Sequence, residues 1–283
     1  MFSWLKRIFK RKKNGTKEAS EIVSFEEKQE AWWGNFVVEE EQSRFWKINN
    51  IVLCLDRYNR EWHIANYKDT QLIQNTNTPI PKEKFRFKTF TSRKDYNEII
   101  IKPTLPDRAI LSQLERPIAL PAGEEILLFI SSPCWIKIEV GNNIILDEIP
   151  SKILSDTWAG KNTLEGELCY ASPNHCSPRL EEITMDESRV LTPILIINRS
   201  KEYLLLNELR IPLPFLSIYS DPLNYLWTEQ VSIYYEGDTH PSSTIVTKPH
   251  KLLKALTLIT PPRLGSKSRT KLKNLLNPFS RKT

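Results

Sequence analysis

Residues 122–150 read AGEEILLFISSPCWIKIEVGNNIILDEIP, and this stretch decides the fold class. Residues 126–130 form a short, continuous apolar run, which is typical of a strand buried on both faces. Residues 135–140 then alternate apolar and charged side chains, as a strand with one buried face does. Gly and Asn at residues 141–143 tolerate positive φ, and residues 144–146 are apolar again, so the pattern predicts a β-hairpin.

The segment that follows the hairpin is rich in Trp, Gly and Tyr, with LSDTWAG at residues 154–160 and GELCYA at 166–171. A Trp in such a segment either fills one end of a β-sandwich or serves in a functional loop, and we prefer the buried, structural role for Trp158. The acidic and aromatic side chains of the segment are the candidates for contact with a partner or ligand. They are Asp156, Trp158, Glu167 and Tyr170.

The composition extends this β character to the whole chain. Nineteen prolines against eight glycines, with many β-branched and aromatic residues, favour strands over helices. Apolar runs of strand length recur with loops between them, which predicts a mainly β fold: a β-sandwich or two packed antiparallel β domains. For the second case, we expect an N-terminal β domain at residues 31–115 and a C-terminal one at 116–248. Within them, we expect one strand at residues 45–55, a short helix or crossing loop at 105–116 and a turn at 198–201.

The net charge of +6 is the sum over parts of the chain that have opposite charge. Residues 1–13 and 239–283 hold 16 of the 40 Lys and Arg and no acidic residue, so residues 14–238 carry 24 basic against 34 acidic side chains. The body is therefore acidic, with a net charge of −10, between two basic ends. Basic ends of this kind seek an anionic surface. The segregation argues against a uniformly basic nucleic-acid-binding domain, and we expect no nucleic acid as a partner.

The N-terminal residues 1–13, MFSWLKRIFKRKK, have the pattern of an amphipathic helix. At about 100° per residue the apolar side chains share an arc of about 160°, and most basic side chains lie outside it. Aromatic and basic residues on opposite faces are typical of a helix in a lipid interface, and a disordered basic tail or a mitochondrial presequence are the alternatives. The membrane-binding candidates here are Phe2, Trp4, Leu5, Lys6, Arg7, Ile8, Phe9, Lys10 and Arg11, and residues 14–30 are expected as a linker.

Residues 249–283 are expected as a basic C-terminal helix or tail. Residues 249–260 have apolar side chains at helical spacing before two prolines. Beyond Gly265, a weaker copy of the amphipathic pattern carries further membrane-binding candidates: Lys271, Leu272, Lys273, Leu275, Leu276 and Phe279. No apolar run approaches the roughly 20 residues of a transmembrane helix, and we expect no secretory signal. The sequence thus predicts a peripheral protein on the cytoplasmic face of the cell membrane, with an anionic membrane surface as a partner.

Cysteine usage points to a reducing compartment. Cys54, Cys134, Cys169 and Cys176 are few for the length, so we expect free thiols. Cys169 and Cys176, with the adjacent His175, lack the close Cys pairs of a structural zinc site. We therefore expect no metal and no cofactor.

Three classes of function stay open from the residues alone. The preferred one is a non-catalytic protein that binds a membrane partner. A hydrolase with Asp156, Glu165 or Glu167 in a loop, or a carbohydrate-binding module, is the second, because carboxylates lie beside aromatic residues. Nucleic-acid binding through the basic ends is the third.

Three blocks of sequence carry a family resemblance: RYNREWHIA at residues 57–65, LSDTWAG…GELCYA at 154–171, and PILIINRS…TEQVSIYY within 190–235. Together they resemble an uncharacterised β-rich family of bacteria and archaea that is often encoded beside small-conductance mechanosensitive channels. The similarity covers about residues 33–238. It implies a membrane-associated accessory protein with such a channel as its partner, and it implies no catalytic residues.

Overall fold

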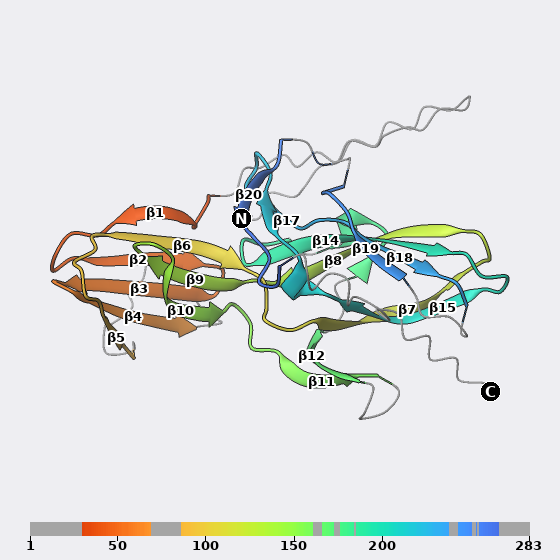
Figure 1. Ribbon diagram of the computed structural model, residues 1–283, viewed down its shortest axis with the longest axis horizontal. Helices are drawn as coiled ribbons and strands as arrows, with labels where there is room; N and C mark the ends of the chain where they lie inside the picture. The colour runs from red at the N-terminus through yellow and green to blue at the C-terminus, as the bar shows by residue number, and fades with distance from the viewer. Residues whose placement is uncertain are drawn as a thin grey trace.

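The computed structural model describes residues 30–68, 86–160, 166–172, 176–183, 185–237, 243–250, 253 and 255–265. These residues form β-strands and short 3-10 turns, with no α-helix among them. The mainly β class predicted from the sequence is confirmed. Figure 1 shows two β-sandwiches that follow one another along the longest axis of the molecule.

The first sandwich consists of two antiparallel four-stranded sheets. One sheet has the order β1 (Gly34–Val37), β6 (Glu98–Thr104), β9 (Trp135–Val140) and β10 (Ile144–Pro150). The other has the order β2 (Ser43–Ile48), β3 (Ile51–Tyr58), β4 (Glu61–Lys68) and β5 (Lys88–Thr91). Their facing side chains are buried in one core, to which both sheets contribute Trp46, Ile48, Leu53, Leu55, Trp62, Ile64, Ile99, Ile101, Ile136, Ile138 and Val140.

The second sandwich consists of two mixed sheets. One has the order β11 (Ser155–Ala159), β12 (Glu167–Ser172), β7 (Ile110–Leu120) and β15 (Leu204–Ile211). The other has the order β13 (Cys176–Ser177), β8 (Glu125–Pro133), β14 (Arg189–Asn198), β17 (Leu226–Trp227), β16 (Ile218–Ser220) and β20 (Thr257–Thr260), and β18 (Val231–Tyr235) joins β14 to β19 (Ser243–Val246). The sheets are mixed because β12 runs parallel to β7, and β17 and β18 run parallel to β14.

The chain weaves between the two sandwiches. β7 and β8 belong to the second sandwich. β9 then returns to pair with β6 of the first, β10 pairs with β9, and β11 crosses back to the second. The predicted hairpin is confirmed as β9 and β10, with positive φ at Gly141 and Asn143 in its turn. The apolar run at residues 126–130 lies in β8, where residues 128–130 are buried. The domain limit expected after residue 115 falls inside β7.

Three local predictions are wrong. Residues 110–116 lie in strand β7, because β12 and β15 pair with it on its two sides. Residues 257–260 form strand β20, which pairs with β16, where a helix was expected. The single strand expected at residues 45–55 is two strands, because Asn49 turns the chain with φ of 53°. In the first two cases pairing with distant strands overrides a local helical pattern.

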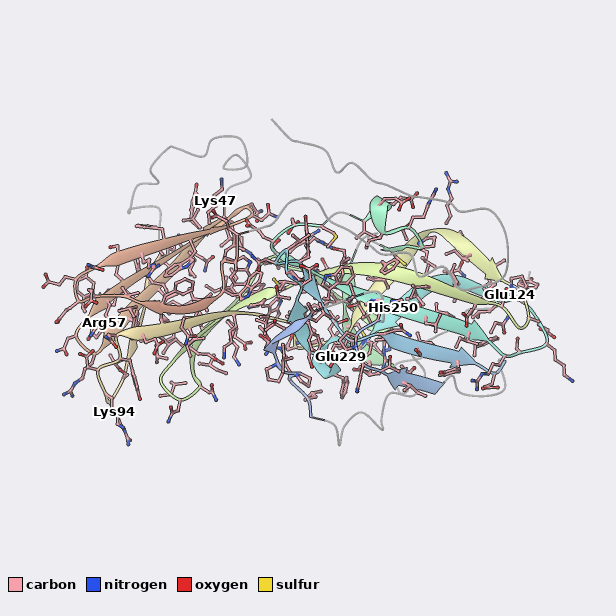
Figure 2. The ribbon with its side chains drawn as sticks, turned by 90° about the horizontal axis from the view of Figure 1, so that it is seen from above. Lys47, Arg57, Lys94, Glu124, Glu229 and His250 are labelled. Atoms are coloured by element: carbon pink, nitrogen blue, oxygen red, sulfur yellow. The ribbon has the colours of Figure 1, made fainter. Side chains whose placement is uncertain are left out.

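The described chain begins and ends at the junction between the sandwiches. Near its start, the indole Nε1 of Trp32 donates to the carbonyl of Glu187 at 2.7 Å. Near its end, Arg263 Nε donates to the carbonyl of Leu105 at 2.6 Å. The backbone N–H of Leu264 donates to the carbonyl of Pro214 at 2.9 Å. Figure 2 shows turns at the far ends of the long axis instead, with Lys94 at one end and Glu124 at the other.

A buried carboxylate on the first sandwich makes the folded state sensitive to acid. The side chain of Glu139 in β9 is 3% exposed and forms ion pairs with Lys137 at 2.6 Å and Lys102 at 3.0 Å. Burial raises the pKa of Glu139, but the hydrogen bonds and charges of the two lysines outweigh it, so the net pKa is lowered.

We therefore expect the contribution of Glu139 to the free energy of unfolding to be complete above pH 4.5, the ordinary glutamate pKa, and to be lost as pH falls through the lower folded pKa. Glu139→Gln should cost about 1–3 kcal/mol at pH 7 and progressively less in acid. Urea unfolding of both proteins at pH 7 and pH 3 measures this. A difference that does not change with pH would contradict it.

Candidate functional site

The β11–β12 hairpin, here called the arm, stands at the rim of the second sandwich. β12 joins β7 through three residue pairs, which run from Tyr170 with Ile110 to Ser172 with Ser112. β11 pairs with β12 and lies at the edge of its sheet. In Figure 1 the two strands lie below β7, away from the rest of the sheet. Most of the arm therefore projects from the body.

The arm has two different faces, set by the antiparallel register. Asp156 is opposite Tyr170, and Trp158 is opposite Leu168, so these four side chains share one face, here called the outer face. The opposite face carries Ala159 and Cys169, which are buried against Ala109. The arm is thus packed on one face and open on the other.

The outer face exposes large apolar side chains. Trp158 is 44% exposed and Leu168 is 40% exposed, so the prediction of a buried, structural Trp158 is wrong. The indole instead lies against the backbone of Gly166, where an added Cβ would come within 1.8 Å of Nε1 of Trp158. Glycine at position 166 therefore gives the ring its place on the arm.

Polar contacts at the base of the arm fix Tyr170 and Asp156. Arg108 forms an ion pair with Asp156 at 3.0 Å, and its guanidinium lies 5.3 Å from the ring centroid of Tyr170. The Tyr170 hydroxyl donates to Asp107 at 2.8 Å. Burial and this hydrogen bond raise the pKa of Tyr170, so the phenol stays a neutral donor. Trp135 of β9 lies 6.4 Å from the Tyr170 ring and links the arm to the first sandwich.

The four candidate side chains do not all meet. Asp156, Trp158 and Tyr170 share the outer face, whereas Glu167 lies opposite Ala159 on the other face and pairs with Arg210 at 2.9 Å. Glu165 lies outside the described residues. The described carboxylates of the arm thus do not face each other as the pair of a glycosidase does.

The described residues of the arm present negative charge to solvent. The Asp156 side chain is 59% exposed against 36% for its partner Arg108. The Glu167 side chain is 56% exposed against 17% for its partner Arg210. Each ion pair therefore places its carboxylate outward and its guanidinium inward.

Arg108 and Trp135 contribute to the site but were not among the candidates from sequence. Arg108 falls in the stretch expected as a helix or loop, and Trp135 in the hairpin that was predicted before the arm. Nothing local in the sequence connects either residue to Tyr170, because the contacts arise from the return of β9 to the first sandwich and from the β12–β7 pairing.

The cysteines are free thiols in the structure, at Cys54, Cys134, Cys169 and Cys176. Burial raises the pKa of Cys169 to about 11 and that of Cys176 to about 12, so neither thiol ionises readily near neutral pH. Within the described part of the chain, no group of three or more Cys, His, Asp or Glu side chains is placed to hold a metal ion. His175 is outside that part.

The membrane-binding candidates lie outside the described residues: Phe2, Trp4, Leu5, Lys6, Arg7, Ile8, Phe9, Lys10, Arg11, Lys271, Leu272, Lys273, Leu275, Leu276 and Phe279. Where the structure describes the chain, no helix is long and apolar enough to cross a bilayer. The interfacial helix at the N-terminus stays a prediction.

Comparison with known proteins identifies the family of this woven β-sandwich protein. Residues 32–276 match the family described as Protein of unknown function (DUF432), and the chain belongs to that family. The predicted membership of an uncharacterised domain family is thereby confirmed. No curated protein and no solved structure shows significant similarity to the chain.

The exposure of Trp158 changes the expected effect of removing it. Trp158→Ala should lower the free energy of unfolding by no more than about 1 kcal/mol, because the ring is already half in solvent. Trp62→Ala is the contrasting variant: Trp62 is fully buried, and its loss should cost about 3–5 kcal/mol. Denaturant unfolding compares the two, and equal losses would contradict the exposed position of Trp158.

Proposed function

We propose that the chain is a non-catalytic accessory protein, peripheral on the cytoplasmic face of the cell membrane, that binds a membrane protein through the outer face of the arm. The partner implied by the family resemblance is a small-conductance mechanosensitive channel. The observation that carries the proposal is the half-exposed pair of Trp158 and Leu168 on a projecting hairpin.

An exposed tryptophan is exceptional in this body. Of the seven Trp residues that the structure describes, Trp32, Trp46, Trp62 and Trp227 are buried. Aromatic side chains dominate the binding energy of protein interfaces because they bury a large area at a low cost in conformational entropy. A half-exposed Trp beside an exposed Leu therefore has the features of an anchor for a partner.

The polar groups of the arm support binding over catalysis. Asp156 is held by Arg108, Glu167 is held by Arg210, and the two lie on opposite faces. Neither carboxylate is placed to work with the other as acid and base. The ion pairs instead stiffen the base of the arm, and a stiff surface loses less entropy when it binds.

The position of the chain ends supports the membrane part of the proposal. Trp32 and Arg263 both make their contacts at the junction between the sandwiches. The basic residues 1–13 and 266–283 therefore connect to the body at its middle, and both can reach one membrane surface. The net charge of −10 on residues 14–238 would keep the body itself off an anionic leaflet.

The test is retention of the full chain by a purified small-conductance mechanosensitive channel in detergent. We expect the wild type to be retained and Trp158→Ala to bind at least about tenfold more weakly, as for a hot-spot residue. Phe45→Ala is the matched control, because Phe45 is 49% exposed but lies on the first sandwich. Equal binding by the two variants would show that the arm is not the contact.

A further inference from the structure

The described chain ends close to the outer face of the arm. The guanidinium of Arg263 lies 5.3 Å from the centroid of the Trp135 ring, and the same ring lies 6.4 Å from that of Tyr170. Arg263 is held in place by its ion pair with Glu148 at 2.8 Å as well as by its hydrogen bond to Leu105. The C-terminal segment, residues 266–283, begins three positions beyond Arg263. The described chain therefore ends beside the arm, and the C-terminal segment continues from that point.

The C-terminal segment is long enough to reach every part of the outer face. The 14 residues from 266 to 279 span up to about 45 Å when extended. Along β11, Trp158 is two residues, or about 7 Å, from Asp156 at the base of the arm. A tether this short keeps the segment at an effective concentration on the order of 1 mM, so even a weak contact is populated.

The chemistry of the segment complements that of the outer face. Residues 266–283 contain six Lys and Arg and no acidic residue, with apolar side chains at Leu272, Leu275, Leu276 and Phe279. The outer face offers Trp158 and Leu168 as exposed apolar surface, and the outward carboxylate of Asp156 beside them. The segment is thus opposite in charge to the outer face and similar to it in apolar character.

We propose that the C-terminal segment of this chain covers the outer face of the arm, with its Leu and Phe side chains over Trp158 and Leu168. The inference rests on the proposed function in taking the outer face as the site for the partner. The segment then competes with the partner for that face. An anionic membrane attracts the same Lys and Arg residues, so it withdraws the segment and uncovers the arm where the partner resides.

Amide hydrogen exchange in β11 and β12 of the full-length chain tests the cover. The tail variant replaces four apolar residues, as Leu272→Ser, Leu275→Ser, Leu276→Ser and Phe279→Ser. We expect exchange in the arm to be at least about threefold faster than in the wild type, because a covered hairpin opens less often. The matched control replaces Trp4→Ser and Phe9→Ser at the other basic end and should leave exchange in the arm unchanged. Equal exchange in the tail variant and the wild type would overturn the proposal.

Vesicles separate this proposal from the membrane function. Phosphatidylcholine vesicles with phosphatidylserine should raise exchange in the wild-type arm to the level of the tail variant, and vesicles of phosphatidylcholine alone should not. If the tail variant exchanges faster but vesicles have no effect, the cover stands and the membrane part of the proposed function fails. If anionic vesicles instead slow exchange in the arm of the tail variant, the arm itself lies on lipid, and the proposed cover is rejected. Exchange that slows as the concentration of the tail variant rises would assign the face to a second copy, which also rejects it.

Discussion

Removing both basic ends should abolish co-flotation of the chain with vesicles that contain anionic lipid. Each Lys or Arg near an anionic leaflet contributes about 1 kcal/mol at best, and residues 1–13 and 266–283 each carry six of them. The apolar side chains Phe2, Trp4 and Phe9 add a hydrophobic contribution that salt does not screen. Two ends joined to one junction act together, because binding of the first raises the effective concentration of the second.

We expect flotation to decrease stepwise as the basic ends are removed. The intact chain should float with anionic vesicles and much less with neutral ones. Removal of residues 1–13 should weaken flotation, and further removal of residues 265–283 should abolish it when no protein partner is present. High salt should reduce flotation of the intact chain without eliminating it. If the doubly truncated chain floats as well as the intact one, the basic ends are not the anchors.

The second large effect is expected at Asn198, a buried residue at the end of β14. Its Nδ2 lies 2.9 Å from the carbonyl of Leu120, 3.0 Å from that of Pro121 and 2.8 Å from that of Glu202. Its Oδ1 accepts from the backbone N–H of Ser200 at 3.0 Å. One amide thus ties the turn after β14 to the turn between β7 and β8, at the far end of the second sandwich.

Asn198→Ala should lower the free energy of unfolding by about 2–5 kcal/mol, because it removes at once all the hydrogen bonds by which this buried amide holds two turns together. Asn198→Asp should be nearly as damaging, since a carboxylate accepts from Ser200 but cannot donate to the three carbonyls. Asn142→Ala is the control, on an exposed residue of the β9–β10 turn, and should change stability by less than about 0.5 kcal/mol. Guanidinium unfolding compares the three, and a stable Asn198→Ala protein would refute the role of the amide.

The parts of the fold that were predictable depend on neighbouring residues. The hairpin of β9 and β10 follows from alternation and a Gly-Asn-Asn turn, and both signals lie within 12 residues. The turn at residues 198–201 could be predicted in the same way. The role of Asn198 could not, because two of its acceptors, the carbonyls of Leu120 and Pro121, lie more than 70 residues away.

The site was predictable only as a segment. Its Trp, Tyr and acidic residues singled out the arm, but the division of these residues between its two faces depends on the register of β11 with β12, which the sequence pattern did not specify. This register places Trp158 on the outer face, where it is exposed, and separates Glu167 from Asp156. The contact of Arg108 with Tyr170 follows from the parallel pairing of β12 with β7, which no short sequence pattern specifies.

The weaving of the chain has a consequence for the order in which the protein can fold during synthesis. The first sandwich lacks two strands of one sheet until Pro150 has left the ribosome. By then β7 and β8 have also emerged, but β14 and β15, with which they pair, have not yet been made. A nascent chain at that stage holds two apolar strands open to solvent, a state that is prone to aggregate. The first sandwich can therefore close while β7 and β8 still wait for their partners, and a cut between β7 and β10 would leave neither half with a complete set of strands.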